Sequence, residues 1–268
     1  MKDLYLMEDL KLSNLPAQAQ TVIEPFLKDI LANYKEDIIS IYIIGSAITK
    51  GFLPKYSDIN TLIVVKGIKL PFYDFIASLG KRYGKKHIRA PLIITREYIN
   101  RSQEVFPLEF LEMKLIHQLV YGEDVLKDIK IEKPDIRLQC ERELKGKLQH
   151  LCQGYIKAMG NKTALTDLFV GSLSGYFPLF RGILFLYGHE IPKEKGDVLH
   201  ALNECCDVDV NVFRNMLDIR SRNFYPPIEA LKEVFKKLYR VLDIITKKVD
   251  EFKLESPLLG GDLGVGKR

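Results

Sequence analysis

Apolar residues recur along the first part of the chain at two spacings, and the changes of spacing predict alternating helices and strands. Residues 17–36 place apolar side chains three and four positions apart, which is typical of an amphipathic helix. Continuous apolar runs at residues 38–44 and 58–65 are typical of buried strands. A short helix is expected to begin at Ser46, between the two runs.

Three further elements follow the same alternation. The pattern predicts a helix over residues 71–83, a strand over 88–95 and a strongly periodic helix over 107–120. Thr95, with Tyr98 three positions later, is typical of a capped helix start. Strands that alternate with helices indicate an α/β layered domain, ending near residue 125.

The pattern changes after Pro134, which marks the expected domain boundary. From there to about residue 252 the apolar positions keep helical spacing, which predicts a bundle of helices. Residues 163–187 are apolar nearly all round, so we place this segment at the centre of the bundle. The expected division is an α/β or α+β domain over 1–130, a helical bundle over 131–256 and a flexible, glycine-rich tail over 257–268.

Composition and charge narrow the classes of protein. The chain has 268 residues, of which 47% are hydrophobic and 28% charged, as in an ordinary globular protein. The net charge of +5 is spread over the length without a long basic block, which argues against a nucleic-acid-binding tail and suits phosphate-bearing ligands. The acidic N-terminal start does not resemble a signal peptide, and the apolar run 168–180 falls short of a membrane span, so we expect a cytoplasmic protein.

The four cysteines do not follow the spacing of a zinc site. They occur at positions 140 and 152 and as the adjacent pair 205 and 206, and the histidines are scattered. Buried, reduced thiols are the better interpretation, and any metal must take oxygen ligands.

A glycine–serine pair ends the first apolar run, and an aspartate opens the second. Gly45 allows a backbone to approach a phosphate closely, and the Ser46 hydroxyl at a helix start is a donor to an anion. Because strand side chains alternate, Asp58 and Asn60 are expected on one face, with Ile59 turned into the core.

Residues 40–65, SIYIIGSAITKGFLPKYSDINTLIVV, resemble the nucleotidyltransferase superfamily, in which a Gly-Ser pair precedes a strand that carries Asp-x-Asp. Residues 106–113 (FPLEFLEM) and 119–126 (LVYGEDVL) are similar to the helix and the Tyr-Gly-Glu-Asp turn of bacterial aminoglycoside nucleotidyltransferases. The resemblance covers residues 35–130 by motif and the rest by layout. It implies a small mixed sheet with flanking helices and a helical bundle that closes over the substrate.

The resemblance also implies a reaction. A nucleoside monophosphate would pass from a triphosphate such as ATP to a hydroxyl of a small molecule in the cleft between the domains, with Mg²⁺ neutralising charge on the phosphates. Lys50 and Lys55 lie in the loop that borders the triphosphate in this fold. The site residues that the resemblance implies are, for nucleotide binding, Gly45, Ser46, Lys50 and Ser57; for catalysis, Asp58 and Asn60; and for the metal, Asp58.

Two features depart from the family pattern. Asn60 stands where the second acid is expected, and because an amide brings no negative charge, a single Mg²⁺ site at Asp58 is the most that we expect. Residues 88–94 contain no acid where the third carboxylate normally lies. Four glutamates beyond that strand are alternatives, although a solvated helical face is the simpler interpretation; they are Glu97, Glu104, Glu109 and Glu112.

The leading hypothesis is therefore a nucleotidyltransferase-like protein that is weak or inactive, because losing a metal ligand and a base removes transition-state stabilisation on the order of several kcal/mol. The alternative is a pseudo-nucleotidyltransferase, a regulatory or toxin–antitoxin type module that binds a nucleotide or a protein partner. It predicts nucleotide binding that is weak or independent of Mg²⁺. The modest charge argues against a third hypothesis, an RNA-directed enzyme of the tRNA or poly(A) type.

Other polar residues have simpler interpretations. Arg181 interrupts an apolar helix, so it is expected to pair with an acid such as Asp167 or with a substrate group. His117, on the predicted helix 107–120, and His189, in a loop, are expected in core or surface roles. A solvated face is expected for Arg214, Arg220 and Arg222.

Overall fold

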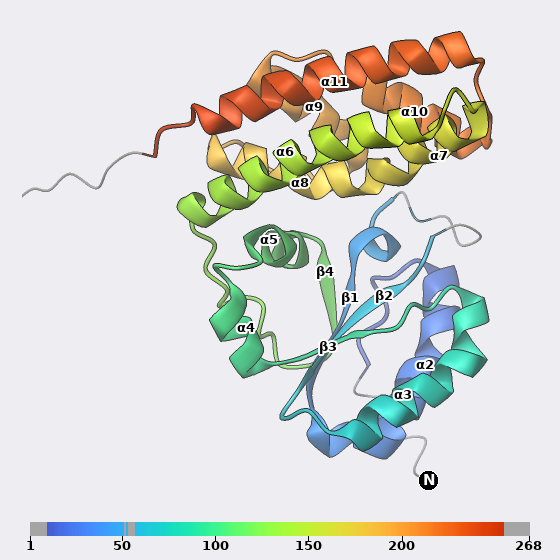
Figure 1. Cartoon of the computed structure of the whole chain (residues 1–268). Coiled ribbons are helices and arrows are strands. Elements are labelled where there is room, and N and C mark those ends of the chain that lie inside the picture. Colours follow the sequence, from blue (N-terminus) through green and yellow to red (C-terminus); the bar gives the residue numbers. More distant parts are fainter. Residues whose placement is uncertain (1–9, 51, 53–56, 255–268) are drawn as a thin grey trace, which may run out of the picture.

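The computed structural model describes residues 10–50, 52 and 57–254. The expected tail over 257–268 and Lys55 lie outside the described residues. The chain forms a small mixed sheet with flanking helices, followed by a helical region, as the sequence predicted (Figure 1).

The N-terminal part begins with the helix that the apolar spacing predicted. Helix α2 (Ala17–Tyr34) turns Ile23, Leu27 and Ile30 into the core, and each of these side chains is fully buried. The remaining elements of this part are η1 (Lys35–Asp37), β1 (Ile38–Ile44), η2 (Gly45–Ile48), β2 (Asn60–Val65), α3 (Leu70–Tyr83), η3 (Gly84–Lys86), β3 (Leu92–Thr95), α4 (Arg96–Ser102), α5 (Pro107–Leu115) and β4 (His117–Gly122).

The sheet has the strand order β3-β2-β1-β4. Strand β1 pairs antiparallel with both β2 and β4, and β2 pairs parallel with β3. Helices α2 and α3 cover one face of the sheet, where Ile41, Ile43 and Ile63 are buried; α4 and α5 lie on the other, where Tyr42 and Leu62 are buried (Figure 1). The two faces alternate along each strand because strand side chains have a period of two.

The predicted helix over 107–120 is wrong in its second half. Helix α5 ends at Leu115, Ile116 leaves helical geometry, and His117–Gly122 forms the edge strand β4. His117 pairs with Ile44 and Gln118 with Ile43, so His117 lies on a strand and not on a helix. Residues 117–122 form hydrogen bonds with β1 in place of those of a further helical turn. This pairing is a tertiary effect, so local periodicity does not predict it.

Two strands begin later than predicted, and one predicted helix is only a short turn. Strand β2 begins at Asn60, and Ile59 makes only an isolated parallel bridge to Ile88. Strand β3 begins after Pro91, which has no backbone N–H to donate to a sheet. The helix expected from Ser46 is a short 3₁₀ turn, whereas the predicted cap of α4 is confirmed, because Thr95 Oγ1 accepts from the Tyr98 N–H at 3.1 Å.

The regular elements of the described C-terminal part are all helices, as predicted. Its elements are α6 (Lys133–Lys157), α7 (Lys162–Ser172), η4 (Leu173–Gly175), α8 (Tyr176–Leu186), α9 (Lys195–Cys206), α10 (Asn211–Arg222) and α11 (Ile228–Asp250). Helices α6 and α11 pack along each other, and α8 lies against α6, α9 and α5 (Figure 1).

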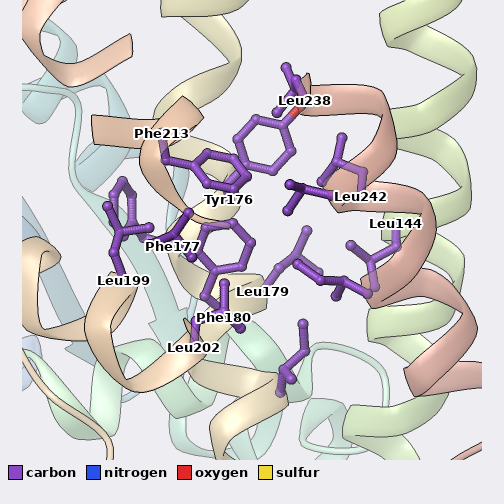
Figure 2. Packing of buried hydrophobic residues seen from close by; sticks show 14 of the residues in the cluster. Leu144, Tyr176, Phe177, Leu179, Phe180, Leu199, Leu202, Phe213, Leu238 and Leu242 are labelled. Atoms are coloured by element: carbon purple, nitrogen blue, oxygen red, sulfur yellow. The ribbon is translucent and has the colours of Figure 1, made fainter. Parts of the chain in front are cut away.

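Helix α8 is the central helix of this region. Figure 2 shows Tyr176, Phe177 and Phe180 of α8 gathered with Phe213 of α10, and the rings of Phe180 and Phe213 meet edge to face at 4.8 Å between centroids. Among the described residues, one helical segment, Lys162–Leu186, is long and apolar enough to cross a membrane, but 56% of its most apolar window is buried inside the protein. The segment is interrupted by the short turn η4, and its buried apolar side chains belong to the core of the helical region.

Candidate functional site

The turn after β1 requires its glycine. Gly45 has a positive φ of 75°, which a residue with a side chain rarely adopts. Its N–H donates to the Ile116 carbonyl at 3.1 Å, and the Ser46 carbonyl accepts from the N–H of Thr49 at 3.2 Å. The backbone of the predicted phosphate-binding turn thus ties β1 to the end of α5.

Asn60 lies directly beside this turn. It pairs with Ile44 across β1 and β2, and its side-chain nitrogen is 3.9 Å from the point where a Cβ on Gly45 would lie. Asn60, Gly45 and Ile44 together line one side of a cavity between the sheet and the helical region. The structure therefore brings two of the predicted site residues, Gly45 and Asn60, into one pocket.

Asp58 is held by a basic partner from the chain that precedes β3. Its Oδ2 is 2.7 Å from Nη2 of Arg89, and its Oδ1 is 3.6 Å from Nδ1 of His87. The pairing follows from the isolated bridge, in which the Ile59 N–H donates to the His87 carbonyl at 2.8 Å and the Arg89 N–H donates to the Ile59 carbonyl at 3.1 Å. The resemblance predicts a carboxylate on this segment, and Arg89 brings the opposite charge there.

The donor set does not fit a two-metal centre. Two Mg²⁺ ions need several charged oxygens in octahedral geometry. Here Asp58 shares its charge with Arg89, Asn60 is neutral, and the described residues contain no group of three or more histidine, cysteine, aspartate or glutamate side chains that could hold a metal ion. The four cysteines are free thiols, of which Cys140 and Cys206 are buried.

The cavity has a volume of about 410 Å³. Its walls come from the sheet, from α5, from α6 and from the start of α8. Half of the lining side chains are polar or charged, but most of the exposed lining surface is apolar. The lining residues are Ile44, Gly45, Asn60, Leu108, Glu109, Glu112, Met113, Ile116, Gln139, Glu143, Lys147, Gly175, Pro178 and Leu179.

Arg181 has the acidic partner that the sequence predicted, but this partner is the half-buried Glu112 and not the example Asp167. Arg181 Nη1 donates to both Glu112 oxygens, at 2.8 and 3.1 Å, so Arg181 pairs with Glu112 and not with Asp167. The Arg181 side chain is only 4% exposed, and its other nitrogens donate to the carbonyls of Pro192 and Lys193. Burial raises the pKa of Glu112, and the charge of Arg181 opposes that shift.

The other polar groups of the cavity have different partners. Glu109 accepts a hydrogen bond from the Gln139 amide at 2.9 Å, and the Gln139 oxygen accepts from the Leu108 N–H at 2.9 Å. Lys147 lies 5.1 Å from the centre of the Tyr176 ring. Burial lowers the pKa of Lys147, and Glu143, one turn earlier in α6, opposes that shift.

The remaining predicted residues lie outside the cavity lining. Ser46 and Ser57 are half-buried, and neither lines the cavity. Lys50 is exposed, and its backbone N–H donates to Glu194 at 3.1 Å. Glu97 and Glu104 are exposed on or after α4, as expected for a solvated face, and so are His189 and the arginines at 214, 220 and 222.

Sequence reasoning missed Arg89, Gln139, Glu143 and Lys147. Arg89 was visible as a basic residue in the segment that should carry an acid. The residues of α6 gave a weaker signal, the i, i+4 pair Glu143 and Lys147 beside the apolar position Leu144. Which helix face meets the sheet is set by packing, so this signal alone could not identify the pocket.

No protein-family model matches the chain, and no curated protein matches it in sequence. Among solved structures, the chain is similar to spectinomycin adenyltransferase AAD(9) from Enterococcus faecialis, which was crystallised with ATP and spectinomycin. The sequence identity is 15%, the similarity covers 83% of this chain and 98% of that chain, and the TM-score is 0.49.

Proposed function

We propose that this protein is a nucleotidyltransferase-fold protein of the aminoglycoside type that binds a nucleoside triphosphate and a small molecule, and transfers nucleoside monophosphate slowly or not at all. The motif around Gly45, Ser46 and Asp58 supports nucleotide binding, and the cavity beside Asn60 supports a small-molecule site. Two domains, divided near residue 130, and a cytoplasmic location are part of the proposal.

The ion pair between Asp58 and Arg89 carries the proposal. A carboxylate paired with a guanidinium at 2.7 Å has less charge to offer a divalent cation, and its neighbour Asn60 adds none. The Arg89 side chain is also 67% exposed, so its guanidinium is open to an anionic ligand such as a phosphate. Binding that depends little on Mg²⁺ is therefore the behaviour that these residues favour, as in the pseudo-enzyme alternative.

Thermal unfolding with nucleotides tests this proposal. The natural protein and Asn60→Asp are each melted with ATP, GTP, CTP or UTP, with and without Mg²⁺. We expect at least one nucleotide to stabilise the natural protein equally well with and without the metal, because a ligand that binds only the folded state stabilises it, by about 2.7 kcal/mol at a concentration of 100 Kd. In Asn60→Asp the restored carboxylate should make the stabilisation larger with Mg²⁺.

Each outcome has a definite meaning. Stabilisation of the natural protein only in the presence of Mg²⁺ would favour a working transferase and contradict metal-independent binding. The absence of any shift in either protein would show that the nucleotide-binding proposal is wrong. Arg89→Gln is the companion variant, in which loss of the metal-independent shift would assign the phosphate contact to Arg89.

A further inference from the structure

The cavity beside Asn60 has the size of a small-molecule site and mostly apolar walls. Its volume of about 410 Å³ falls within the range of roughly 300–1,000 Å³ that is typical of ligand pockets. Leu108, Met113 and Ile116 of the α5 segment line it together with Pro178 and Leu179 of α8. A ligand that fills this space must bury apolar surface, which a heavily hydroxylated molecule lacks.

The charges on the walls do not contribute equally. Glu112 is neutralised by Arg181, which donates to both of its oxygens. Glu143 and Lys147 lie one turn apart on α6 and carry opposite charges. Glu109 accepts a hydrogen bond from a neutral amide, that of Gln139. With Arg181 counted, the described lining residues thus carry one more negative than positive charge.

We infer that this cavity binds a largely apolar molecule that carries a single ammonium group, with the ammonium at Glu109 and the apolar body between α5 and α8. Gln139 keeps the Glu109 carboxylate in place, because its amide bridges Glu109 and the first turn of α5. A polycation would leave its further charges among apolar side chains, which is costly. An anion would meet Glu109, and Lys147 already has Glu143 and the Tyr176 ring beside it.

Titration calorimetry on the 268-residue chain without nucleotide tests the inference. The probe is phenylbutylamine, and the comparison compounds are phenylbutanol as its neutral analogue, phenylbutyrate as its anionic analogue and spermidine as a polycation. We expect saturable binding of phenylbutylamine that is at least about tenfold tighter than that of each comparison compound, which corresponds to about 1.4 kcal/mol. No saturable binding of the amine at millimolar concentration, or equal or tighter binding of any of the other three, would overturn the inference.

Two matched variants assign the charge. Glu109→Gln should weaken phenylbutylamine binding about tenfold, to the level of phenylbutanol, while Glu104→Gln should leave it unchanged. Both replace an exposed glutamate by its amide, but Glu104 does not line the cavity. An equal effect of the two variants, or no effect of either, would show that Glu109 does not receive the ammonium group.

The inference deepens the proposed function, since the ligand would be the small molecule of the nucleotidyltransferase-like site. The two tests remain separable. The calorimetry contains no nucleotide, so its failure leaves nucleotide binding untouched. Conversely, loss of all nucleotide-dependent stabilisation would still leave an amine-binding cavity to be measured.

Discussion

At the scale of single residues, this protein differs from what its motif implies mainly through charge. An amide at position 60 and an arginine at position 89 reduce the negative charge where a metal-dependent enzyme concentrates it. The Asp58 ion pair is partly exposed, with 67% of the Arg89 side chain accessible, so its contribution to stability is small. In the function that we propose, its role is to make nucleotide binding depend little on a metal ion.

The ion pair between Arg181 and Glu112 has the opposite character, because it is buried. We expect Arg181→Met to lower the free energy of unfolding by about 3–5 kcal/mol at neutral pH, since it leaves the Glu112 carboxylate without its partner. The pKa of Glu112 is already raised by burial, and removing Arg181 raises it further. A group whose pKa is higher in the folded protein destabilises it as the pH rises above the pKa of the unfolded chain. The loss should therefore shrink as the pH falls toward about 4.3, the ordinary pKa of a glutamate.

Urea denaturation followed by circular dichroism, at neutral pH and at about pH 4.3, measures this loss of stability. The double variant Arg181→Met with Glu112→Gln is the control, because it removes the group that titrates. The single variant should therefore have a lower free energy of unfolding than the double variant at neutral pH, and this difference should shrink at the lower pH. If the difference were the same at both pH values, Glu112 would not be the group that responds.

At the scale of elements, the Tyr-Gly-Glu-Asp segment has a structural reason for its glycine. Gly122 ends β4 with φ of 80°, and a Cβ there would lie 2.0 Å from the Ile39 carbonyl oxygen. Beside it, the Tyr42 hydroxyl accepts from the Val125 N–H at 2.6 Å and contacts Asp124 at 3.1 Å. These contacts hold residues 124 and 125, which follow β4, against β1.

We expect Gly122→Ala to lower the free energy of unfolding by roughly 2–4 kcal/mol, because the positive φ is strained for alanine and the added methyl group overlaps backbone. Gly80→Ala is the matched control. Gly80 lies inside α3 with no atom within 4 Å of its Cβ position, so alanine there should stabilise by about 1 kcal/mol. Urea denaturation compares the two, and equal effects would contradict the role assigned to Gly122.

At the scale of the whole molecule, α5 belongs to two cores. Leu108 and Leu111 are buried in the cluster of the helical region, whereas Phe110 is buried in the cluster on the sheet. A Cβ on Gly182 of α8 would lie 2.3 Å from Leu108 Cδ2, so the two helices meet closely. The division into domains near residue 130 stays a prediction, but the described packing joins the two sides through this helix.

We expect Leu108→Ala to destabilise the sheet and the helical region together, by about 2–5 kcal/mol, because it empties a buried position at their junction. Hydrogen exchange followed by mass spectrometry should show protection falling by similar amounts in β2 and in α8. Leu138→Ala is the control, since Leu138 is 64% exposed and should change stability by no more than about 0.5 kcal/mol. Loss of protection in α8 alone would show that the two parts open independently.

Up to β3, the order of the main helices and strands followed from the sequence because it depends on local periodicity. The continuous run of residues 38–44 became a buried strand, and the apolar segment around Phe177 and Phe180 became the central helix. Expecting Arg181 to find a buried partner was also sound, because an unpaired charge in an apolar helix is costly at any position in the fold.

The tertiary structure decided the features that join residues distant in the chain, namely the edge strand, the ion pairs and the cavity. Residues 117–122 are a strand because β1 offers them an edge, although their spacing continues that of a helix. Glu112, not Asp167, pairs with Arg181 because α5 packs on α8. The surroundings of residues 40–65 also come from outside the motif. Arg89 pairs with Asp58, and residues of α5 and α6 line the cavity beside Asn60. A sequence motif specifies local geometry, whereas charge compensation and cavity shape arise only when its neighbours are packed around it.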